Sequence, residues 1–267
     1  MAGPGPLGAR HQKVVRLRRL VARRGVRAAE RAFVIEGETL VSEALSAGVV
    51  VEALFVADGS QDLPVVRRAG ADGYRVHRLD PGVLERVAGT VTPQPVLAVA
   101  QACDVALEAV VGTGLVMVCV DVRDPGNAGN ILRSAEAAGA GAVVFCTGSV
   151  DVFNPKTVRS SAGSLFHVPV VSGGDPVEVL QRMYHWGFRR LATVARGGRP
   201  FDEVDLVGAV AVVVGNEAHG LPAGLDTHVD EHVTIPMAGR AESLNVGMAA
   251  ALICFEALRQ RRTGRPA

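Results

Sequence analysis

The sequence predicts an α/β protein with a small first domain and a larger second domain. Valine-rich apolar runs alternate with helical stretches along its 267 residues, which is typical of mostly parallel sheets covered by helices on both faces. This alternation becomes regular only from residue 115 onward. With 48% hydrophobic residues the chain has enough apolar side chains to bury a core, which excludes wholesale disorder.

A basic segment occupies residues 10–31, where Glu30 is the only acid. Val14, Leu17 and Leu20 recur there at helical spacing. The net charge of +1 alone predicts no polyanionic partner, but a local run of arginines suits a phosphate backbone. A solvated helix face or a loose basic tail is the alternative. The side chains that we expect to contact phosphates are Arg10, Lys13, Arg16, Arg18, Arg19, Arg23 and Arg24.

A small α/β unit follows the basic segment. Residues 33–47 are typical of a short strand that enters a helix, which Gly48 ends. Further expected elements are strands at 49–56, 74–79 and 96–100 and a helix at 81–88. In the larger domain we expect strands at 115–120, 142–146, 168–171, 191–194 and 209–214. The predicted division is a basic extension (1–30), a small α/β domain (31–102), a linker (103–114) and a large domain (115–267).

Composition excludes several classes of function. Aromatic residues make up only 4% of the chain, which argues against recognition mainly by stacking bases. The four cysteines are far apart and show no zinc spacing, so we expect free thiols in a reducing compartment and no metal site. The longest apolar run is too short and interrupted to span a bilayer. We therefore expect a soluble cytoplasmic protein that does not act at a membrane.

Three polar turns that follow predicted strands are the main functional signal. They lie within the segments VCVDVRDPGNAGNILRSAEAAGA (118–140), VAVVVGNEAHGLP (210–222) and IPMAGRAESLNVGMAAALICFEALRQRR (235–262). Ligands bind outside the carboxyl ends of parallel strands, so we expect the turns to form one composite site. The glycine fingerprint of dinucleotide-binding folds and the GxxxxGK loop are both absent, because Val144 and Leu221 stand where glycine and lysine belong. This disfavours a nucleotide-dependent oxidoreductase.

These segments resemble a known family. NAGNILRSAEAAGA, VVVGNEAHGLP and IPMAGRAESLNVGMAAALICFEALRQR look like the three signature motifs of the SpoU/TrmH family of RNA ribose 2′-O-methyltransferases, within the knotted SPOUT group. FNPKTVRSSAGSLFHVPV (153–170) is similar to the family's intermediate segment. The likeness runs continuously from residue 115 to 262. More weakly, FVIEGETLVSEAL, which begins at Phe33, resembles the start of its L30-like substrate-binding domain.

The resemblance implies a C-terminal domain with a trefoil knot, S-adenosylmethionine as methyl donor, and a homodimer with sites near the subunit interface. It implies an RNA substrate, and the two-domain plan favours 23S rRNA over tRNA. Some relatives confer resistance to antibiotics that target the ribosome. The alternatives are a tRNA ribose methyltransferase, a non-catalytic RNA-binding or ribosome assembly factor on the same scaffold, and base methylation. The motif residues are intact, which argues against the non-catalytic RNA-binding or assembly factor.

The resemblance also implies particular site residues. Gly215 permits close approach of the chain, and Ile235 and Leu244 suit the walls of an adenine slot, although core packing and a plain turn are the alternatives. Residues implied to bind the donor are Gly215, Asn216, Glu217, Leu221, Ile235, Met237, Ser243 and Leu244. The seven histidines show no metal-ligand spacing, and His167 and His219 are expected to be incidental.

Residues implied to act in catalysis are Asn127, Arg133, Ser243 and Asn245. A guanidinium is not a base, so we expect Arg133 to grip a target phosphate and stabilise the developing alkoxide. The alternatives are a pairing of Arg133 with Glu136 and simple helix capping by Ser243 and Asn245. Lys156 and Arg159 are expected to line the RNA approach, or to be solvated surface charges.

Overall fold

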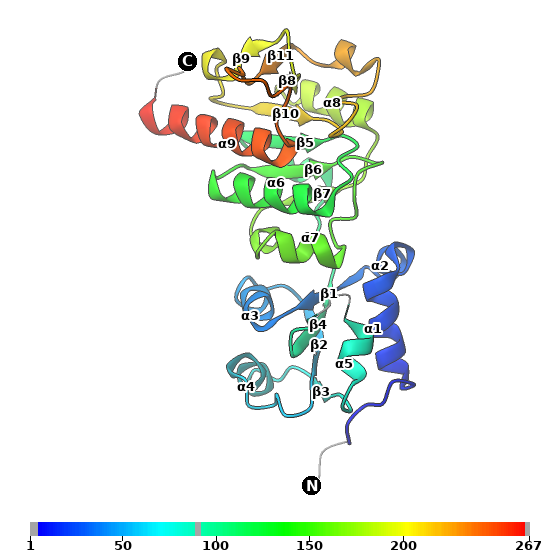
Figure 1. Cartoon of the computed structure of the whole chain (residues 1–267). Coiled ribbons are helices and arrows are strands. Elements are labelled where there is room, and N and C mark those ends of the chain that lie inside the picture. The colour runs from blue at the N-terminus through cyan, green and yellow to red at the C-terminus, as the bar shows by residue number, and fades with distance from the viewer. Residues whose placement is uncertain (1–4, 89–91, 265–267) are drawn as a thin grey trace. The chain divides into compact units, whose positions relative to one another are not determined.

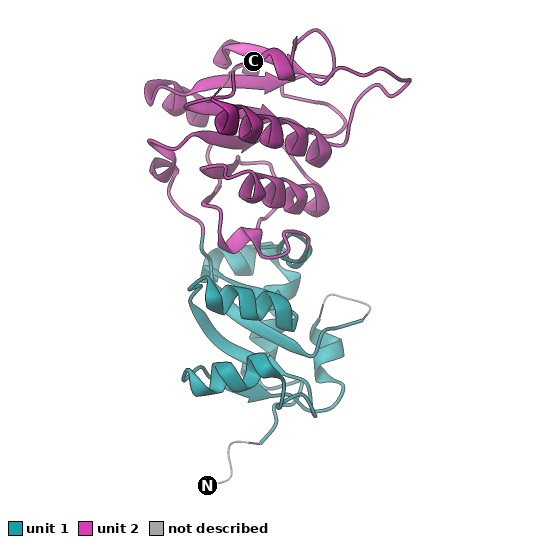
Figure 2. Ribbon diagram, turned by 90° about the vertical axis from the view of Figure 1, so that its left-hand side faces the viewer, with its two compact units in different colours: residues 1–103, 153–159 teal, residues 104–152, 160–267 magenta. Residues whose placement is uncertain are grey.

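The protein is described by a computed structural model that covers residues 5–88 and 92–264 and forms two compact units (Figure 2). Unit 1 comprises residues 1–103 and 153–159, and unit 2 comprises residues 104–152 and 160–267. This division differs from the predicted one, because the basic segment belongs to unit 1 and a short later segment returns to it. The first residues of the predicted extension, 1–4, lie outside the described residues.

Unit 1 is built on a four-stranded sheet in the order β1-β4-β2-β3, in which the β2–β3 pair is parallel and the others antiparallel. Its strands are β1 (Ala32–Glu36), β2 (Val51–Val56), β3 (Val76–Arg78) and β4 (Val96–Gln101). Its helices are α1 (Gln12–Ala22), α2 (Arg24–Glu30), α3 (Glu38–Ser46), α4 (Pro64–Ala71) and α5 (Val83–Val87). Helices α1 and α5 lie on one face of the sheet, and α3 and α4 on the other (Figure 1).

The basic segment is an amphipathic helix in the core of unit 1. Val14, Leu17 and Leu20 are buried against the sheet, which explains their helical spacing. Arg27 is buried and donates hydrogen bonds to two carbonyls at the end of α1. The side chain of Arg16 lies 2.6 Å from carboxylates of both Glu30 and Glu52.

The side chain of Arg16 is therefore engaged in ion pairs within the fold, which weakens the case for its assignment to phosphate contact, and that assignment stays a prediction. Each of its two ion pairs uses a guanidinium N–H that a phosphate would otherwise need. These hydrogen bonds and charges raise the pKa of Arg16 further above its usual value. The other basic residues of α1 point to solvent.

Unit 2 is built on a seven-stranded sheet in the order β7-β6-β5-β10-β8-β11-β9, whose described pairs are all parallel. Its strands are β5 (Leu115–Cys119), β6 (Ala142–Phe145), β7 (Val170–Ser172), β8 (Arg189–Thr193), β9 (Arg199–Pro200), β10 (Val210–Val214) and β11 (Glu231–Thr234). The α/β fold class and the mostly parallel sheet are confirmed. The short edge strand β9 was not predicted, because two residues carry no period.

Helices cover both faces of this sheet: α6 and α9 lie side by side on one face, and α8 packs on the other (Figure 1). The α-helices that begin after residue 104 are α6 (Pro125–Ala137), α7 (Pro155–Ser160), α8 (Pro176–His185) and α9 (Val246–Thr263). Short 3₁₀ turns are η1 (Leu107–Val110), η2 (Ser164–Phe166), η3 (Phe201–Glu203) and η4 (Leu225–His228). No described helix is long and apolar enough to cross a membrane.

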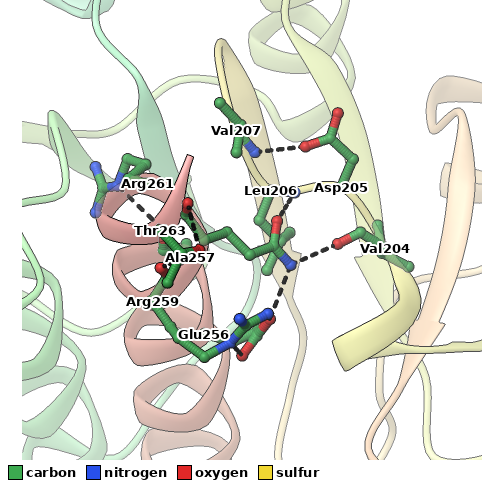
Figure 3. A network of polar contacts seen from close by, with 10 residues as sticks. Val204, Asp205, Leu206, Val207, Glu256, Ala257, Arg259, Arg261 and Thr263 are labelled. Atoms are coloured by element: carbon green, nitrogen blue, oxygen red, sulfur yellow. Dashed lines mark hydrogen bonds and ion pairs between the residues drawn. The ribbon is translucent and has the colours of Figure 1, made fainter. Parts of the chain in front are cut away.

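Polar contacts anchor the C-terminal half of α9 (Figure 3). The amide of buried Gln260 donates to the Val204 carbonyl at 2.9 Å and accepts from the Leu206 N–H at 2.8 Å. Arg261 donates to the carbonyls of Ala138 and Gly139 at the end of α6, which also opposes the negative end of that helix. With its far end fixed in this way, α9 presents its first turn to the strand ends.

Candidate functional site

A pocket of about 340 Å³ lies at the carboxyl ends of β8, β10 and β11 and is closed by the first turns of α9. This volume lies at the lower end of the range for small-molecule sites. Its lining consists of Thr193, Val194, Ala195, Gly215, Asn216, Glu217, Ala218, His219, Gly220, Val233, Ile235, Met237, Ser243, Leu244, Val246, Ala249 and Ile253. Aliphatic walls and a rim of polar turns thus share one cavity.

All residues that the sequence implied for donor binding line this pocket except Leu221. Leu221 instead packs against the hydrophobic core of the sheet, and its assignment to donor binding stays a prediction. The end of β8, at Thr193 to Ala195, was not predicted to contribute. This contribution could have been predicted from the sequence, because β8 was an expected strand and the carboxyl ends of parallel strands lie at the same edge of the sheet. His219, expected to be incidental, also lines the pocket.

Gly215 is required by the protein's own backbone. A Cβ added there would lie 2.5 Å from the Gly220 carbonyl carbon and 2.7 Å from the Leu221 nitrogen. Asn216 and Gly220 close the turn by exchanging backbone hydrogen bonds of 2.8 and 2.9 Å. The close approach expected at Gly215 is therefore that of residues 216–220, which fold back over it and form one wall of the pocket.

Asn127 joins the three polar turns. Its side-chain amide donates to Glu217 Oε1 at 2.8 Å, and its side-chain oxygen accepts from Asn245 Nδ2 at 2.8 Å. Asn127 is buried at the start of α6, and its backbone N–H is capped by Asp124 at 2.9 Å. An asparagine suits this position because it offers a donor to the carboxylate and an acceptor to the amide at once. The turns therefore converge, as predicted.

A second contact ties the turn after β5 to the turn after β10. The side-chain amide of Asn216 donates to the Asp121 carbonyl at 3.0 Å, while its oxygen accepts from the backbone N–H groups of Ala218 and His219. Asp121 has a positive φ of 56°, which a short polar side chain tolerates better than a branched one. The hydrogen bonds of Asn216 shape its own turn and hold it to the neighbouring one.

Asn245 caps α9 as well as contacting Asn127. Its side-chain oxygen accepts from the backbone N–H of Gly247 at 2.9 Å. Gly247 packs closely on α6, since an added Cβ there would lie 3.0 Å from the Asn130 Cβ. The capping alternative is thus right for Asn245 and compatible with a role in the site. Ser243 is exposed and lines the pocket.

Arg133 is exposed on α6, and its side chain makes no hydrogen bond or ion pair within the described part of the chain. Its alternative partner Glu136 instead accepts from the Ser164 hydroxyl at 3.5 Å. Arg133 does not line the pocket of its own chain. At 1.5 Å per residue it lies about 9 Å further along the helix axis than Asn127.

The segment with Lys156 and Arg159 shows a different arrangement from the expected RNA approach. Arg159 Nη1 lies 2.8 Å from a carboxylate oxygen of Glu36, whose side chain is only 4% exposed. Both residues belong to unit 1, so this guanidinium compensates a buried charge there. This ion pair gives Arg159 a structural role, and its assignment to RNA contact stays a prediction, whereas Lys156 is exposed.

The buried cysteines take no part in this site. Burial raises the pKa of the Cys119 thiol well above its usual value and raises the pKa values of Cys146 and Cys254 to about 12. Only a thiolate is a strong nucleophile, so these thiols remain inert near neutral pH.

The fold and the site define the class of protein: a parallel α/β domain that holds a nucleotide-type cofactor with polar turns in place of a glycine fingerprint. The family follows from comparison. The chain belongs to the SpoU rRNA methylase family, whose model matches residues 114–255. The model of the MRM3-like substrate binding domain matches residues 11–98.

Characterised relatives agree with this family. The chain is 36% identical to the 23S rRNA (guanosine(2553)-2′-O)-methyltransferase RlmP of Bacillus subtilis, over 92% of this chain and 96% of that protein. It is 40% identical to the 23S rRNA (uridine(2479)-2′-O)-methyltransferase of Streptomyces viridochromogenes, over 54% and 52% of the two chains. The crystal structure of the SpoU methyltransferase AviRb from Streptomyces viridochromogenes, in complex with AdoMet, matches with a TM-score of 0.87 and 31% identity over 96% and 100%.

Replacing Asn127 by aspartate is expected to weaken both the fold and donor binding. The new carboxylate would face Glu217 at hydrogen-bond distance and remove the donor that this carboxylate now has. We expect a loss of about 1–3 kcal/mol in the free energy of unfolding, measured by urea denaturation, and weaker donor binding in calorimetry. Asn130→Asp, an equal charge change at an exposed position one turn on, should leave both values nearly unchanged. Equal behaviour of the two variants would show that the network does not hold the turns.

Proposed function

We propose that the protein transfers a methyl group from S-adenosylmethionine to a ribose 2′-hydroxyl of 23S rRNA. The observation that carries the proposal is the contact of Asn127 with Glu217 and Asn245, which joins the first family motif to the two motifs that line the pocket. A relative that matches nearly the whole chain is named as an enzyme of this reaction. A tRNA target is the second candidate, and the relatives with assigned substrates favour rRNA.

The pocket has the properties that this donor requires. Ile235 and Leu244 supply apolar surface for the adenine, and the strand ends offer backbone N–H and carbonyl groups to its polar edge. The turn at residues 216–220 carries Glu217 toward the network with Asn127. When bound, the donor supplies an electrophilic sulfonium methyl group. The protein's part is to hold it in a fixed orientation beside the target ribose.

In the transfer, the ribose 2′-oxygen forms a bond to the methyl carbon while the carbon–sulfur bond breaks, and the hydroxyl proton leaves to a phosphate oxygen or water. Alignment of the two reactants provides much of the acceleration. Arg133 is the exposed, unpaired cation of α6 that we assign to the target phosphate and to the charge that develops on the 2′-oxygen. Ser243 and Asn245 fix the rim through which the ribose enters.

The proposed function is tested by incubating the protein and labelled S-adenosylmethionine with unmodified 23S rRNA or tRNA and digesting the products to nucleosides. We expect label in a single 2′-O-methylated nucleoside from 23S rRNA. Label confined to tRNA would support the second candidate instead. Label in a base, or in neither RNA, would contradict ribose methylation.

We also propose that the protein is a homodimer, with an apolar stripe on α9 in the interface. Met248, Leu252 and Phe255 are 62, 43 and 50% exposed and follow the i, i+4, i+7 spacing of one helix face. Large side chains in such a row are typical of a face that a partner covers. A second copy is the occupant we propose, because an isologous contact lets one helix stripe cover its own equivalent.

The substitution pair Leu252→Glu and Phe255→Glu is expected to convert the dimer to a monomer. Sedimentation equilibrium should then give half the wild-type mass, because two buried carboxylates per subunit would oppose each other in the interface. Val50→Glu, at a similarly exposed valine of unit 1, is the control and should leave the mass unchanged. A dimer of undiminished stability in the double variant would place the interface elsewhere.

A further inference from the structure

An exposed cluster of cations in unit 1 is formed by two segments that are far apart in the sequence. Lys13 Nζ, in the first turn of α1, lies 2.9 Å from His77 Nε2 in β3. His11 precedes Lys13 as the N-cap of α1, and Arg75 precedes β3. We call the side chains of His11, Lys13, Arg75 and His77 the α1–β3 cluster.

Among residues 5–88 and 92–264, no carboxylate forms an ion pair with this cluster. Burial lowers the pKa of His77 below its usual value, and the charges of Lys13, His11 and Arg75 lower it further. No acid is among the groups that act on it. Asp80, which follows β3, instead lies beside Gly8.

Three other arginines of unit 1 differ from Arg75, because each has a carboxylate partner. Arg16 pairs with Glu30 and Glu52, Arg67 with Asp62, and Arg68 with Asp72. By contrast, Arg75 is exposed, and its side chain makes no hydrogen bond or ion pair within the described part of the chain. Like charges gathered without a counter-ion oppose one another, so the α1–β3 cluster is a place where an anion is favoured.

The hydrogen-bonding groups of the cluster suit an acceptor with several oxygens. An ammonium can only donate, so the Lys13 contact requires a neutral His77 that accepts at Nε2 and keeps its proton on Nδ1. The His77 ring lies 5.3 Å from the Phe55 ring, which helps to fix its orientation. Lys13, Arg75 and His77 then all offer N–H donors.

We propose that the α1–β3 cluster binds a backbone phosphate of the RNA substrate. The inference rests on the proposed function, and it adds a contact at β3 that a sequence reading confined to the basic segment does not contain. Because phosphates are the same at every nucleotide, this contact positions the RNA and contributes affinity without selecting a sequence. The proposed contact lies at the first turn of α1, away from Arg16, whose side chain forms ion pairs within unit 1.

The test measures binding of a transcribed 23S rRNA fragment by fluorescence anisotropy at several salt concentrations. The double variant Lys13→Gln, Arg75→Gln is expected to bind roughly tenfold or more weakly, and the slope of log K against log salt should fall by about 1–2. The control is Arg67→Gln, Arg68→Gln, which removes the same charge from α4 on the opposite face of the sheet. It should change the affinity by less than about twofold.

A charge-preserving variant, Lys13→Arg with Arg75→Lys, should restore most of the affinity and the salt slope, which a purely structural role would not predict. Donor affinity, measured by calorimetry, verifies that unit 2 is intact in every variant. If wild type binds the fragment and the Gln variant binds it equally well with the same slope, the cluster inference is overturned while the proposed function stands. If wild type itself binds no RNA, the proposed function fails.

Discussion

The Arg133→Ala variant is expected to lose about 10²–10³-fold in kcat, because a positioned charge next to a developing oxyanion has an effect of this size. Arg133 is exposed and has no partner within the described residues, so its removal breaks no structural contact. It does not line the donor pocket, so the donor dissociation constant should stay within a few-fold. Single-turnover methyl transfer and calorimetry measure these two quantities.

Two further variants decide how Arg133 acts. Arg133→Lys keeps the charge but loses the planar fork, and we expect turnover to fall by more than about tenfold. Arg262→Ala removes an equally exposed arginine from the last turn of α9 and should have wild-type turnover. Near-full activity of Arg133→Lys would show that bidentate phosphate contact is not needed. A collapse of donor binding in Arg133→Ala would assign the residue to the donor site instead.

The Gly215→Ala variant is expected to bind the donor roughly 5- to 150-fold more weakly. The added Cβ would meet backbone atoms of Gly220 and Leu221 at 2.5–2.7 Å, and backbone cannot move aside as a flexible side chain does. Overpacking of this kind costs about 1–3 kcal/mol, and 1.4 kcal/mol is a factor of about ten in affinity. The turn at residues 216–220 must shift, and it forms one wall of the pocket.

Gly70→Ala is the matched control for this prediction. Gly70 lies in α4 with open space around its Cα and no unusual φ, so alanine there should leave the donor affinity unchanged and stabilise the protein slightly. Calorimetry with S-adenosylhomocysteine and thermal unfolding give both values. Wild-type donor affinity in Gly215→Ala would mean that the turn over Gly215 does not form the binding surface.

Much of the fold can be predicted because its strands carry a strong local signal. Continuous apolar runs such as Leu115–Cys119 and Val210–Val214 become buried parallel strands, and their positions agree with the expected ranges to within a few residues. Elements without such a signal were missed: α4 has only eight residues, and β9 has two. Their structure depends on tertiary contacts with strands far along the chain, which no local pattern reveals.

The site, like the fold, could be predicted only in part. The turns at Asn127, Gly215 and Asn245 were predicted to meet because they follow parallel strands, and the structure joins them. The sequence does not show which of the predicted site side chains form ion pairs with other parts of the fold. The partners of Arg16 and Arg159 are a glutamate on β2 and a glutamate on β1, and these pairings arise only when the sheet of unit 1 is formed. Motif spacing locates a residue but does not show its partners.

A crystal structure of the protein with S-adenosylhomocysteine would show directly whether the pocket beside the joined turns binds the methyl donor. We expect the adenine to lie between the segments that carry Ile235 and Leu244, with the sulfur facing the side where Asn127 meets Glu217 and Asn245. A ligand bound on any surface remote from these residues would contradict it, whatever the activity of the protein.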